Sequence, residues 1–285
     1  MAEALRPGRT VDAEVWVLEG ASFARKSDRL VTEEPLEIRL SAGAARRTLA
    51  VTMRTPGNDF ELAAGFLIGE GIVARRDEIA TIDYCLDEEL DADQRYNVVN
   101  VALNRAALPQ LERFERHFVT SSACGVCGRA RLDALRDLGV APLDDDLRIS
   151  PELLYSLPGR MREAQRVFDS TGGLHAAALF DESGLPLAVR EDVGRHNAVD
   201  KLVGWAALAN ALPLSRRLLV VSGRAGYEIL QKAAVARIPL VASISAPSSL
   251  AVELARAFNV TLAGFVRGER ANVYAARERI AVRPN

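Results

Sequence analysis

The chain has 285 residues, of which 49% are hydrophobic and 26% are charged. At about 150 residues per domain this length suits two domains, and the composition is that of a globular protein with a sizeable core. The formal net charge of −2 gives no overall attraction to nucleic acid or membranes, so anion binding must come from local groups of arginines. No run approaches the ~18 apolar residues of a membrane span, and residues 1–10 do not resemble a signal peptide. With only three cysteines and no export signal, we expect a cytoplasmic protein that binds neither nucleic acid nor membranes.

Strands and one helix are predicted in the first part of the chain. Alternating apolar and polar residues predict strands at 14–18, 36–40, 48–54 and 96–103. A helix is expected after Asn58, which can cap it, and is expected to stop at Gly69 and Gly71. Residues 1–120 are therefore predicted to form a smaller α+β domain.

Two thiols lie in a Ser/Gly-rich loop in the middle of the chain. Residues 121–128 read SSACGVCG and place Cys124 and Cys127 three positions apart. Arg129 and Arg131 follow, a setting that favours the thiolate. Residues 121–146 are expected to form this loop and a connector between the domains.

Several uses of the CxxC pair compete. A structural zinc site needs two more ligands at zinc spacing, and the remaining candidates are scattered along the chain. They are Cys85, His117, His175 and His196. A redox dithiol is expected in a thioredoxin-like strand–CxxC–helix unit, which does not open this chain. Inert or disulfide-bonded thiols fit poorly in a glycine-rich turn. The remaining interpretation is a thiolate nucleophile or persulfide carrier.

Helices and strands alternate after the connector. Helices are predicted at 151–168, 197–210, 227–237 and 250–258, and strands at 218–221, 240–244 and 261–266, with hairpin arms at 174–180 and 185–190. Short apolar strands between helices predict a central sheet covered on both faces. Residues 147–285 are therefore predicted to form a three-layer α/β domain.

Three turns lead from a strand to a helix, at 190–197, 222–226 and 245–249, and each contains glycine or serine. Such turns line the ligand crevice of open α/β sheets, and their N–H groups can hold phosphate. A tight turn or a helix cap explains any one of them equally well, but three in succession with Arg195 and Arg224 favour a phosphorylated ligand. His196, at a helix start, can bond such a ligand or act as a cap. His175, on an apolar strand, is equally explained as a hydrogen-bonded core residue.

Ordered motifs in this sequence resemble the FdhD family of formate dehydrogenase accessory sulfurtransferases. They are SSACGVCG at 121–128, GGLHAA at 172–177, EDVGRHNAVDKLVG at 191–204, SGRAGYEILQK at 222–232 and PLVASISAPSSL at 239–250. The resemblance spans nearly the whole chain and implies a cytidine-deaminase-like C-terminal domain. The deaminase zinc signature is absent, because Ala177 stands where a glutamate would follow His175 and the CxxC pair precedes that histidine. A zinc-dependent deaminase is thereby disfavoured, and no permanently bound metal is expected.

The resemblance implies a carrier of sulfane sulfur. Family members accept sulfur from a cysteine desulfurase on the CxxC loop and pass it to the molybdenum (or tungsten) bis(molybdopterin guanine dinucleotide) cofactor, the bound substrate, before its insertion into formate dehydrogenase. The thiolate form attacks the donor persulfide. Cys124, followed by a glycine, is expected to carry the persulfide and Cys127 to relay or expel it, with the reverse assignment open. A homodimer is expected, and a non-catalytic cofactor-binding chaperone is the alternative.

The family's cofactor site falls partly on a C-terminal segment. In this chain that segment consists of Phe265, Val266, Arg267, Gly268, Glu269 and Arg270. Arginine suits phosphate oxygens and an aromatic face suits guanine, although an ordinary exposed basic turn explains the segment equally well. We expect a guanine nucleotide to lie between this segment and the loops at His196 and Arg224, with Glu269 accepting guanine N–H groups or pointing to solvent. Cys85, on an expected strand without a basic neighbour, is expected to be dispensable.

Overall fold

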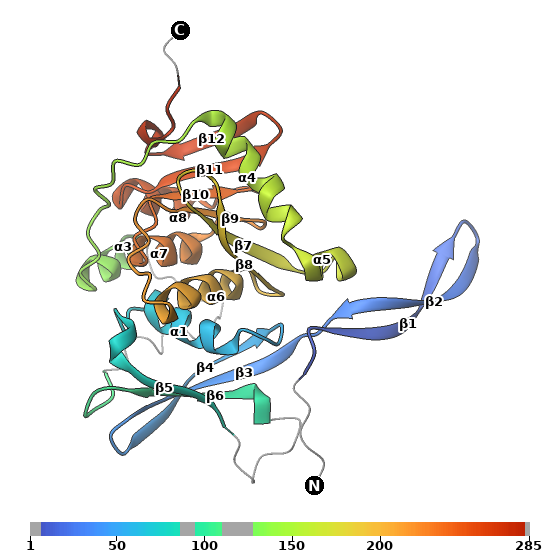
Figure 1. Cartoon of the computed structure of the whole chain (residues 1–285), viewed down its shortest axis with the longest axis horizontal. Coiled ribbons are helices and arrows are strands. Elements are labelled where there is room, and N and C mark those ends of the chain that lie inside the picture. Colours follow the sequence, from blue (N-terminus) through green and yellow to red (C-terminus); the bar gives the residue numbers. More distant parts are fainter. Residues whose placement is uncertain (1–6, 86–94, 110–127, 283–285) are drawn as a thin grey trace.

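The computed structural model describes residues 7–85, 95–109 and 128–282. Two sheets lie one above the other with helices between them, and a separate two-stranded hairpin projects from the side (Figure 1). This arrangement confirms the predicted α/β class.

The larger sheet has six strands. In spatial order they are β12 (Arg270–Ala275), β11 (Thr261–Arg267), β10 (Leu240–Ser243), β9 (Leu218–Val221), β7 (His175–Phe180) and β8 (Pro186–Asp192). β9, β10 and β11 run parallel, whereas β7, β8 and β12 pair antiparallel with their neighbours. The short parallel strands are buried on both faces, which is why each reads as a continuous apolar run.

Helices cover both faces of the six-stranded sheet, as predicted for three layers. One face is covered by α6 (Arg195–Leu208), α7 (Tyr227–Val235) and α8 (Ser249–Ala257), whose apolar side chains share a core with Leu219 and Val241. The other is covered by α4 (Pro151–Glu163), followed by the short α5 (Arg166–Thr171). The helices that connect the parallel strands therefore cover one face of the sheet, and α4 and α5 cover the opposite face.

The smaller sheet belongs to the first part of the chain. Its strands, in spatial order, are β4 (Ala45–Arg54), β3 (Glu34–Ala42), β6 (Val98–Leu103) and β5 (Ile79–Tyr84). Helix α1 (Asp59–Gly69) covers its inner face and packs directly on α6 (Figure 1). One buried cluster runs from Leu36 and Ile38 of the small sheet through both helices to Val221 of the large one. The predicted division at residues 120 and 147 stays a prediction.

The contact between α1 and α6 depends on two glycines. A Cβ at Gly65 would overlap the Asp200 carbonyl oxygen, and a Cβ at Gly204 would overlap the Glu61 carbonyl oxygen. The backbones of the two helices therefore touch, which only residues without side chains permit.

Charged residues buried between the two sheets occur as pairs. Lys201 Nζ lies 2.7 Å from Asp192 Oδ2, and both side chains are almost completely inaccessible. Lys232 Nζ lies 2.7 Å from Asp200 Oδ1 in an equally buried pair. Such charges persist in a core because each is neutralised by its partner.

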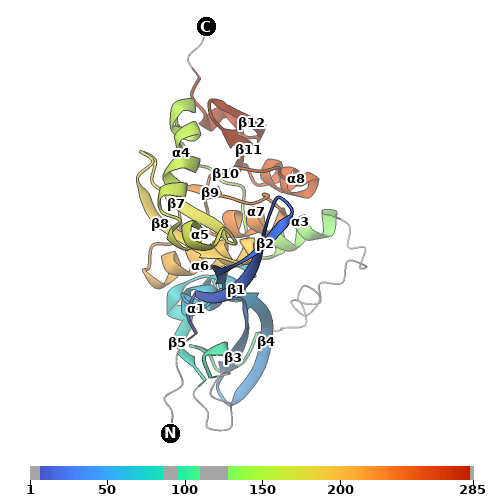
Figure 2. The same cartoon turned by 90° about the vertical axis from the view of Figure 1, so that its right-hand side faces the viewer.

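A hairpin formed by β1 (Thr10–Glu19) and β2 (Ser22–Val31) projects from the body and pairs with no other strand of the described residues (Figures 1 and 2). Trp16 is 61% exposed and Phe23 66% exposed near its tip, and their rings meet edge to face. β2 was not predicted, because nearly all its residues face solvent and its sequence is polar.

Other elements depart from the expected pattern. The helix predicted at 151–168 is two helices, because the Glu191 carboxylate accepts hydrogen bonds from the amides of Val167 and Phe168 and so caps a second helix. Asn58 stands at the start of α1 but its side chain accepts from Arg9 instead of capping. The predicted strand at 96–103 begins two residues late. The elements not predicted also include β5, β12, α3 (Gly128–Asp137) and the short 3-10 turns η1 (Arg76–Glu78), η2 (Arg95–Asn97) and η3 (Arg277–Arg279).

Candidate functional site

The three turns at 190–197, 222–226 and 245–249 meet at the carboxyl edge of the parallel strands. Ser243 Oγ donates to the Gly223 carbonyl at 2.7 Å, the Ser248 amide donates to the Ala225 carbonyl at 3.1 Å, and the Phe265 amide donates to the Ser245 carbonyl at 3.1 Å. The antiparallel register of β7 also brings His175 to this edge, opposite Asp192 of β8. The structure thus places the loops around His196 and Arg224 and the segment 265–270 along one border of the sheet.

The amino-terminal ends of α6 and α7 lie at this border, and neither has a side-chain cap. α6 starts after Gly194 and α7 after Gly226, and neither residue has a side chain that could bond the first amides. By contrast, Ser248 caps α8 by accepting from the Ala251 amide. Free amides carry partial positive charge and suit an anion. The third turn is therefore explained as a cap, whereas Gly194 and Gly226 provide no side-chain cap for the first two helices.

Four arginines on this edge have no ion-pair or hydrogen-bond partner within the described residues. They are Arg195, Arg224, Arg267 and Arg270. Three of these side chains are exposed, but Arg195 is only partly so, and its Nε is buried without a partner. A buried guanidinium N–H that bonds nothing carries a free-energy penalty that an anionic ligand would remove.

The two histidines of this edge are both neutral bases at neutral pH. Burial lowers the pKa of His175, and the positive charges of Arg195 and Arg224 lower it further. Burial also lowers the pKa of His196, whereas Glu228, whose Oε2 lies 3.1 Å from Nδ1, opposes that shift. Each imidazole can therefore donate one hydrogen bond and accept another. The sequence had left His175 equally well explained as a core residue, and the structure instead places it half-buried at the strand edge.

A pocket of about 470 Å³ lies at the same edge, on the side covered by α4 and α5. It is lined by Arg162, Gln165, Phe168, Gly172, Gly173, Leu174, His175, Ser222 and Ile244. The residues from α4 and α5 were not identified from the sequence. The polar Gln165 is 3% exposed, and the break between two helices that places it has no local sequence signal.

The segment at 265–270 is a hairpin rather than a strand end. β11 continues to Arg267, the chain turns at Gly268 and Glu269, and β12 starts at Arg270, which pairs with Arg267. Phe265 adopts a left-handed backbone conformation, with φ of 54°, at an irregularity in the strand. The side chain of Val266 is buried in the core beneath α4, so only its backbone faces the edge. Glu269 is exposed at the turn.

Comparison with known proteins identifies the family. The model of the FdhD/NarQ family matches residues 31–281. The chain belongs to this family. The resemblance inferred from the motifs is thereby confirmed.

Relatives in the FdhD/NarQ family match over nearly their full length. A sulfur carrier protein FdhD of Streptomyces avermitilis is 54% identical over 269 residues, covering 93% of this chain and 94% of the relative. One of Mycobacterium tuberculosis is 48% identical over 275 residues, covering 95% and 98%. A crystal structure from Desulfotalea psychrophila, assigned as a formate dehydrogenase accessory protein, is 25% identical with a TM-score of 0.73 and covers 95% of this chain and 99% of that chain.

The two candidate sulfur-carrying residues of this FdhD/NarQ protein, Cys124 and Cys127, lie outside the described residues. Cys85 directly follows β5 and is half-buried. The expectation that it lacks a basic neighbour is wrong, because Arg39 Nη1 lies 3.8 Å from its Sγ. Arg39 comes from β3, a strand distant in sequence that β6 connects to β5.

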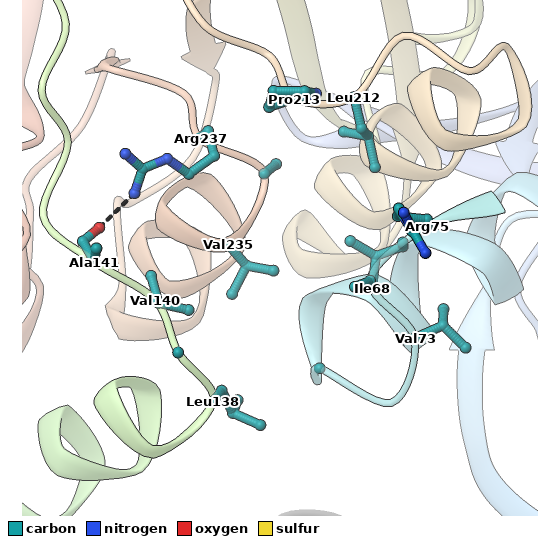
Figure 3. Close-up of a pocket in the computed structure, with 14 residues that line it drawn as sticks. Ile68, Val73, Arg75, Leu138, Val140, Ala141, Leu212, Pro213, Val235 and Arg237 are labelled. Carbon is teal, nitrogen blue, oxygen red and sulfur yellow. Dashed lines mark hydrogen bonds between the residues drawn. The ribbon is translucent and has the colours of Figure 1, made fainter. Parts of the chain in front are cut away.

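A second cavity, of about 500 Å³, lies at the amino ends of the parallel strands (Figure 3). Apolar side chains from four segments surround it, among them Ile68, Leu138, Leu212 and Val235. The guanidinium of Arg237 on its wall donates to the Ala141 carbonyl and is thus occupied within the protein (Figure 3). Among the described residues that line it, the side chains other than those of Arg75 and Arg237 are apolar or absent.

The structure describes residues 7–85, 95–109 and 128–282. Within these ranges no three His, Cys, Asp or Glu side chains are grouped as metal ligands. No helix in the same ranges is long and apolar enough to cross a bilayer.

Proposed function

We propose that this protein carries sulfur from a cysteine desulfurase, as a persulfide on its CxxC loop, to the molybdenum (or tungsten) bis(molybdopterin guanine dinucleotide) cofactor of a formate dehydrogenase. Support comes from its membership of the FdhD/NarQ family and from relatives named sulfur carrier proteins. The structural observation that supports it best is the row of unpartnered arginines at the strand edge, beside two uncapped helix ends. Such a border suits the phosphates of a dinucleotide.

The sulfur transfer starts with a thiolate at Cys124. This thiolate attacks the terminal sulfur of the desulfurase persulfide, a new S–S bond forms on Cys124, and the desulfurase cysteine leaves as a thiolate. Cys127 then attacks the inner sulfur of the Cys124 persulfide, which releases the terminal sulfur as sulfide to the metal and leaves a disulfide. A cellular dithiol reductant restores both thiols for the next cycle.

The cofactor is the substrate and is held at the strand edge before it passes to formate dehydrogenase. The protein acts as a homodimer. The amides at the start of α6 and the guanidinium of Arg195 bind phosphate oxygens. Arg224, Arg267 and Arg270 extend the positive potential outward, and Phe265 offers a ring face at the border.

Mass spectrometry of the full chain after incubation with a cysteine desulfurase and cysteine tests the sulfur step. The peptide that contains Cys124 and Cys127 should gain the mass of one sulfur atom, and Cys124→Ala should abolish activation of formate dehydrogenase. Cys85→Ala is the matched control and should load sulfur normally. Full activation by Cys124→Ala would contradict the assignment of that residue.

A non-catalytic chaperone that binds the cofactor is the alternative function. It predicts nucleotide binding at the strand edge with no sulfur on the protein. Absence of the added sulfur from a protein that still binds GDP would therefore favour the chaperone.

A further inference from the structure

The cavity at the amino ends of the parallel strands is an apolar depression in the surface. Its volume is about 500 Å³. Leu138 and Val140 lie on one side of it and Ile68 and Val73 on the other (Figure 3). Leu138 is 41% exposed, so the apolar lining is in contact with solvent. Concave apolar surfaces of this size mark sites that receive an apolar group from another molecule.

The charges around this cavity are positive. Among the described residues that line it, the charged ones are Arg75 and Arg237, which lie on opposite sides (Figure 3). The carbonyls of Ala141 and Pro142 accept hydrogen bonds from the Arg237 guanidinium, so they fix its position without neutralising its charge. Arg75 Nε lies 3.5 Å from Asp77 Oδ1 in a pair that is exposed to solvent and therefore weak. The matching surface is an apolar side chain flanked by carboxylates.

Helix α3 connects this cavity with the CxxC segment. α3 begins at Gly128, the residue after Cys127, and ends at Asp137, the residue before Leu138. A ten-residue helix is about 15 Å long. A protein bound at the cavity therefore lies about one such helix length from the point where the CxxC segment joins α3. The edge with the free arginines is at the opposite ends of the strands, so this protein would not compete with a ligand there.

We propose that the cavity is the docking site of the cysteine desulfurase, which inserts an apolar side chain beside Leu138 while neighbouring carboxylates face Arg75 and Arg237. The inference rests on the proposed function, because it gives a place on the protein to the sulfur donor. Docking makes the encounter between the donor persulfide and the CxxC pair effectively intramolecular and so raises its rate. Sulfur thus enters at the amino ends of the strands, and the cofactor is held at their carboxyl ends.

Binding of the full chain to an immobilised cysteine desulfurase, measured by biolayer interferometry, tests the docking site. Leu138→Glu puts a carboxylate on the apolar lining and Arg75→Glu reverses a charge, so each should raise Kd about tenfold or more. Val273→Glu is the control for the first, because Val273 is 40% exposed and lies on β12, outside the cavity. Arg277→Glu, at another exposed arginine outside the cavity, is the control for the second. Both controls should bind like the wild type.

The rate of sulfur addition from two donors separates docking from thiol chemistry. The first donor is the desulfurase with cysteine, at concentrations below its Kd. The second is glutathione persulfide, which gives its terminal sulfur to the thiolate and leaves as glutathione thiolate. In mass spectrometry, Leu138→Glu and Arg75→Glu should load sulfur about tenfold more slowly than the wild type from the desulfurase. They should load at the wild-type rate from glutathione persulfide, which shows that the fold and the thiols are intact.

Three results would overturn the docking site while leaving the sulfur-carrier function in place. They are wild-type loading from the desulfurase in both variants, equally slowed loading from both donors, and dissociation of the dimer with unchanged desulfurase affinity. The last of these would assign the cavity to a second copy of the chain. Absence of added sulfur on the wild-type protein from either donor would instead contradict the proposed function itself.

Discussion

The contact between α1 and α6 and the carboxyl edge of the large sheet use charged residues in opposite ways. Around the helix contact, Lys201 of α6 and Lys232 of the neighbouring α7 are buried, and each has a carboxylate at 2.7 Å. At the strand edge, Arg195 and Arg224 have no carboxylate or other partner among the described residues. A pair satisfied inside the protein contributes to the fold, whereas unpaired cations and free amides leave binding capacity for an anion. Changes at the first region should therefore alter stability, and changes at the second should alter binding.

The largest effect on stability is expected from Lys201→Met. This change leaves the buried Asp192 carboxylate without its cation, although Asp192 still accepts from the amides of Thr55 and Gly194. We expect a loss of about 3–5 kcal/mol in the free energy of unfolding, measured by denaturant titration. The double variant Asp192→Asn/Lys201→Met should recover part of this loss, because it removes the unpaired charge. A loss below about 1 kcal/mol would contradict the role assigned to the pair.

A smaller loss of stability is expected from Gly204→Ala. The added methyl group would overlap the Glu61 carbonyl and force α1 and α6 apart. Overpacking of this kind costs about 1–3 kcal/mol. Gly159→Ala in α4 is the control, since its Cβ would meet no atom within 4 Å, and it should stabilise the helix by about 0.5–1 kcal/mol. Equal effects of the two substitutions in thermal unfolding would show that the helices do not touch at Gly204.

Substitutions of the edge arginines should separate binding from stability. Arg270→Ala should weaken GDP binding by about 1.5–3 kcal/mol if it makes a charge-assisted hydrogen bond. Its unfolding free energy should change by no more than about 0.5 kcal/mol, since its side chain is exposed and unpaired. Calorimetry on Arg267→Ala and Arg270→Ala checks this, and unchanged affinity in both would exclude the segment from the site.

The smallest effect concerns the pH dependence of stability. The pKa of His175 is lowered by folding, so the unfolded chain binds more protons below about pH 6.5 and the free energy of unfolding falls as the pH falls. Burial raises the pKa of Asp200 to about 7 although Lys232 beside it opposes the shift, so Asp200 loses its charge below that pH and acts in the opposite direction. Denaturant titrations from pH 7.5 to pH 5 should therefore compare wild type with His175→Gln. The variant should lose less stability on acidification, and parallel curves would show that His175 is not shielded from protons in the folded state.

Much of the large sheet was predictable because its strands are short and wholly buried. The run at 218–221 matches β9 at both ends, and the hairpin arms match β7 and β8 closely. β2 was missed because its strand form depends on pairing with β1 and not on burying a face. α5 was missed as a separate helix because its cap is the Glu191 side chain, more than twenty residues away. The local periodicity of apolar residues indicates which side of one element is buried. It does not indicate which distant residues pair with that element.

The sequence by itself determined the family, the alternation of strands and helices, and the presence of arginines and glycines in successive turns. Which of the charged residues remain free was decided only by the tertiary structure. Within the single motif at 191–204, Asp192 and Lys201 neutralise each other in the core, whereas Arg195 lies at the edge with its Nε unpaired. The physical reason is that the free energy of a polar group depends on its burial and its partners, and both are set by contacts between segments distant in sequence.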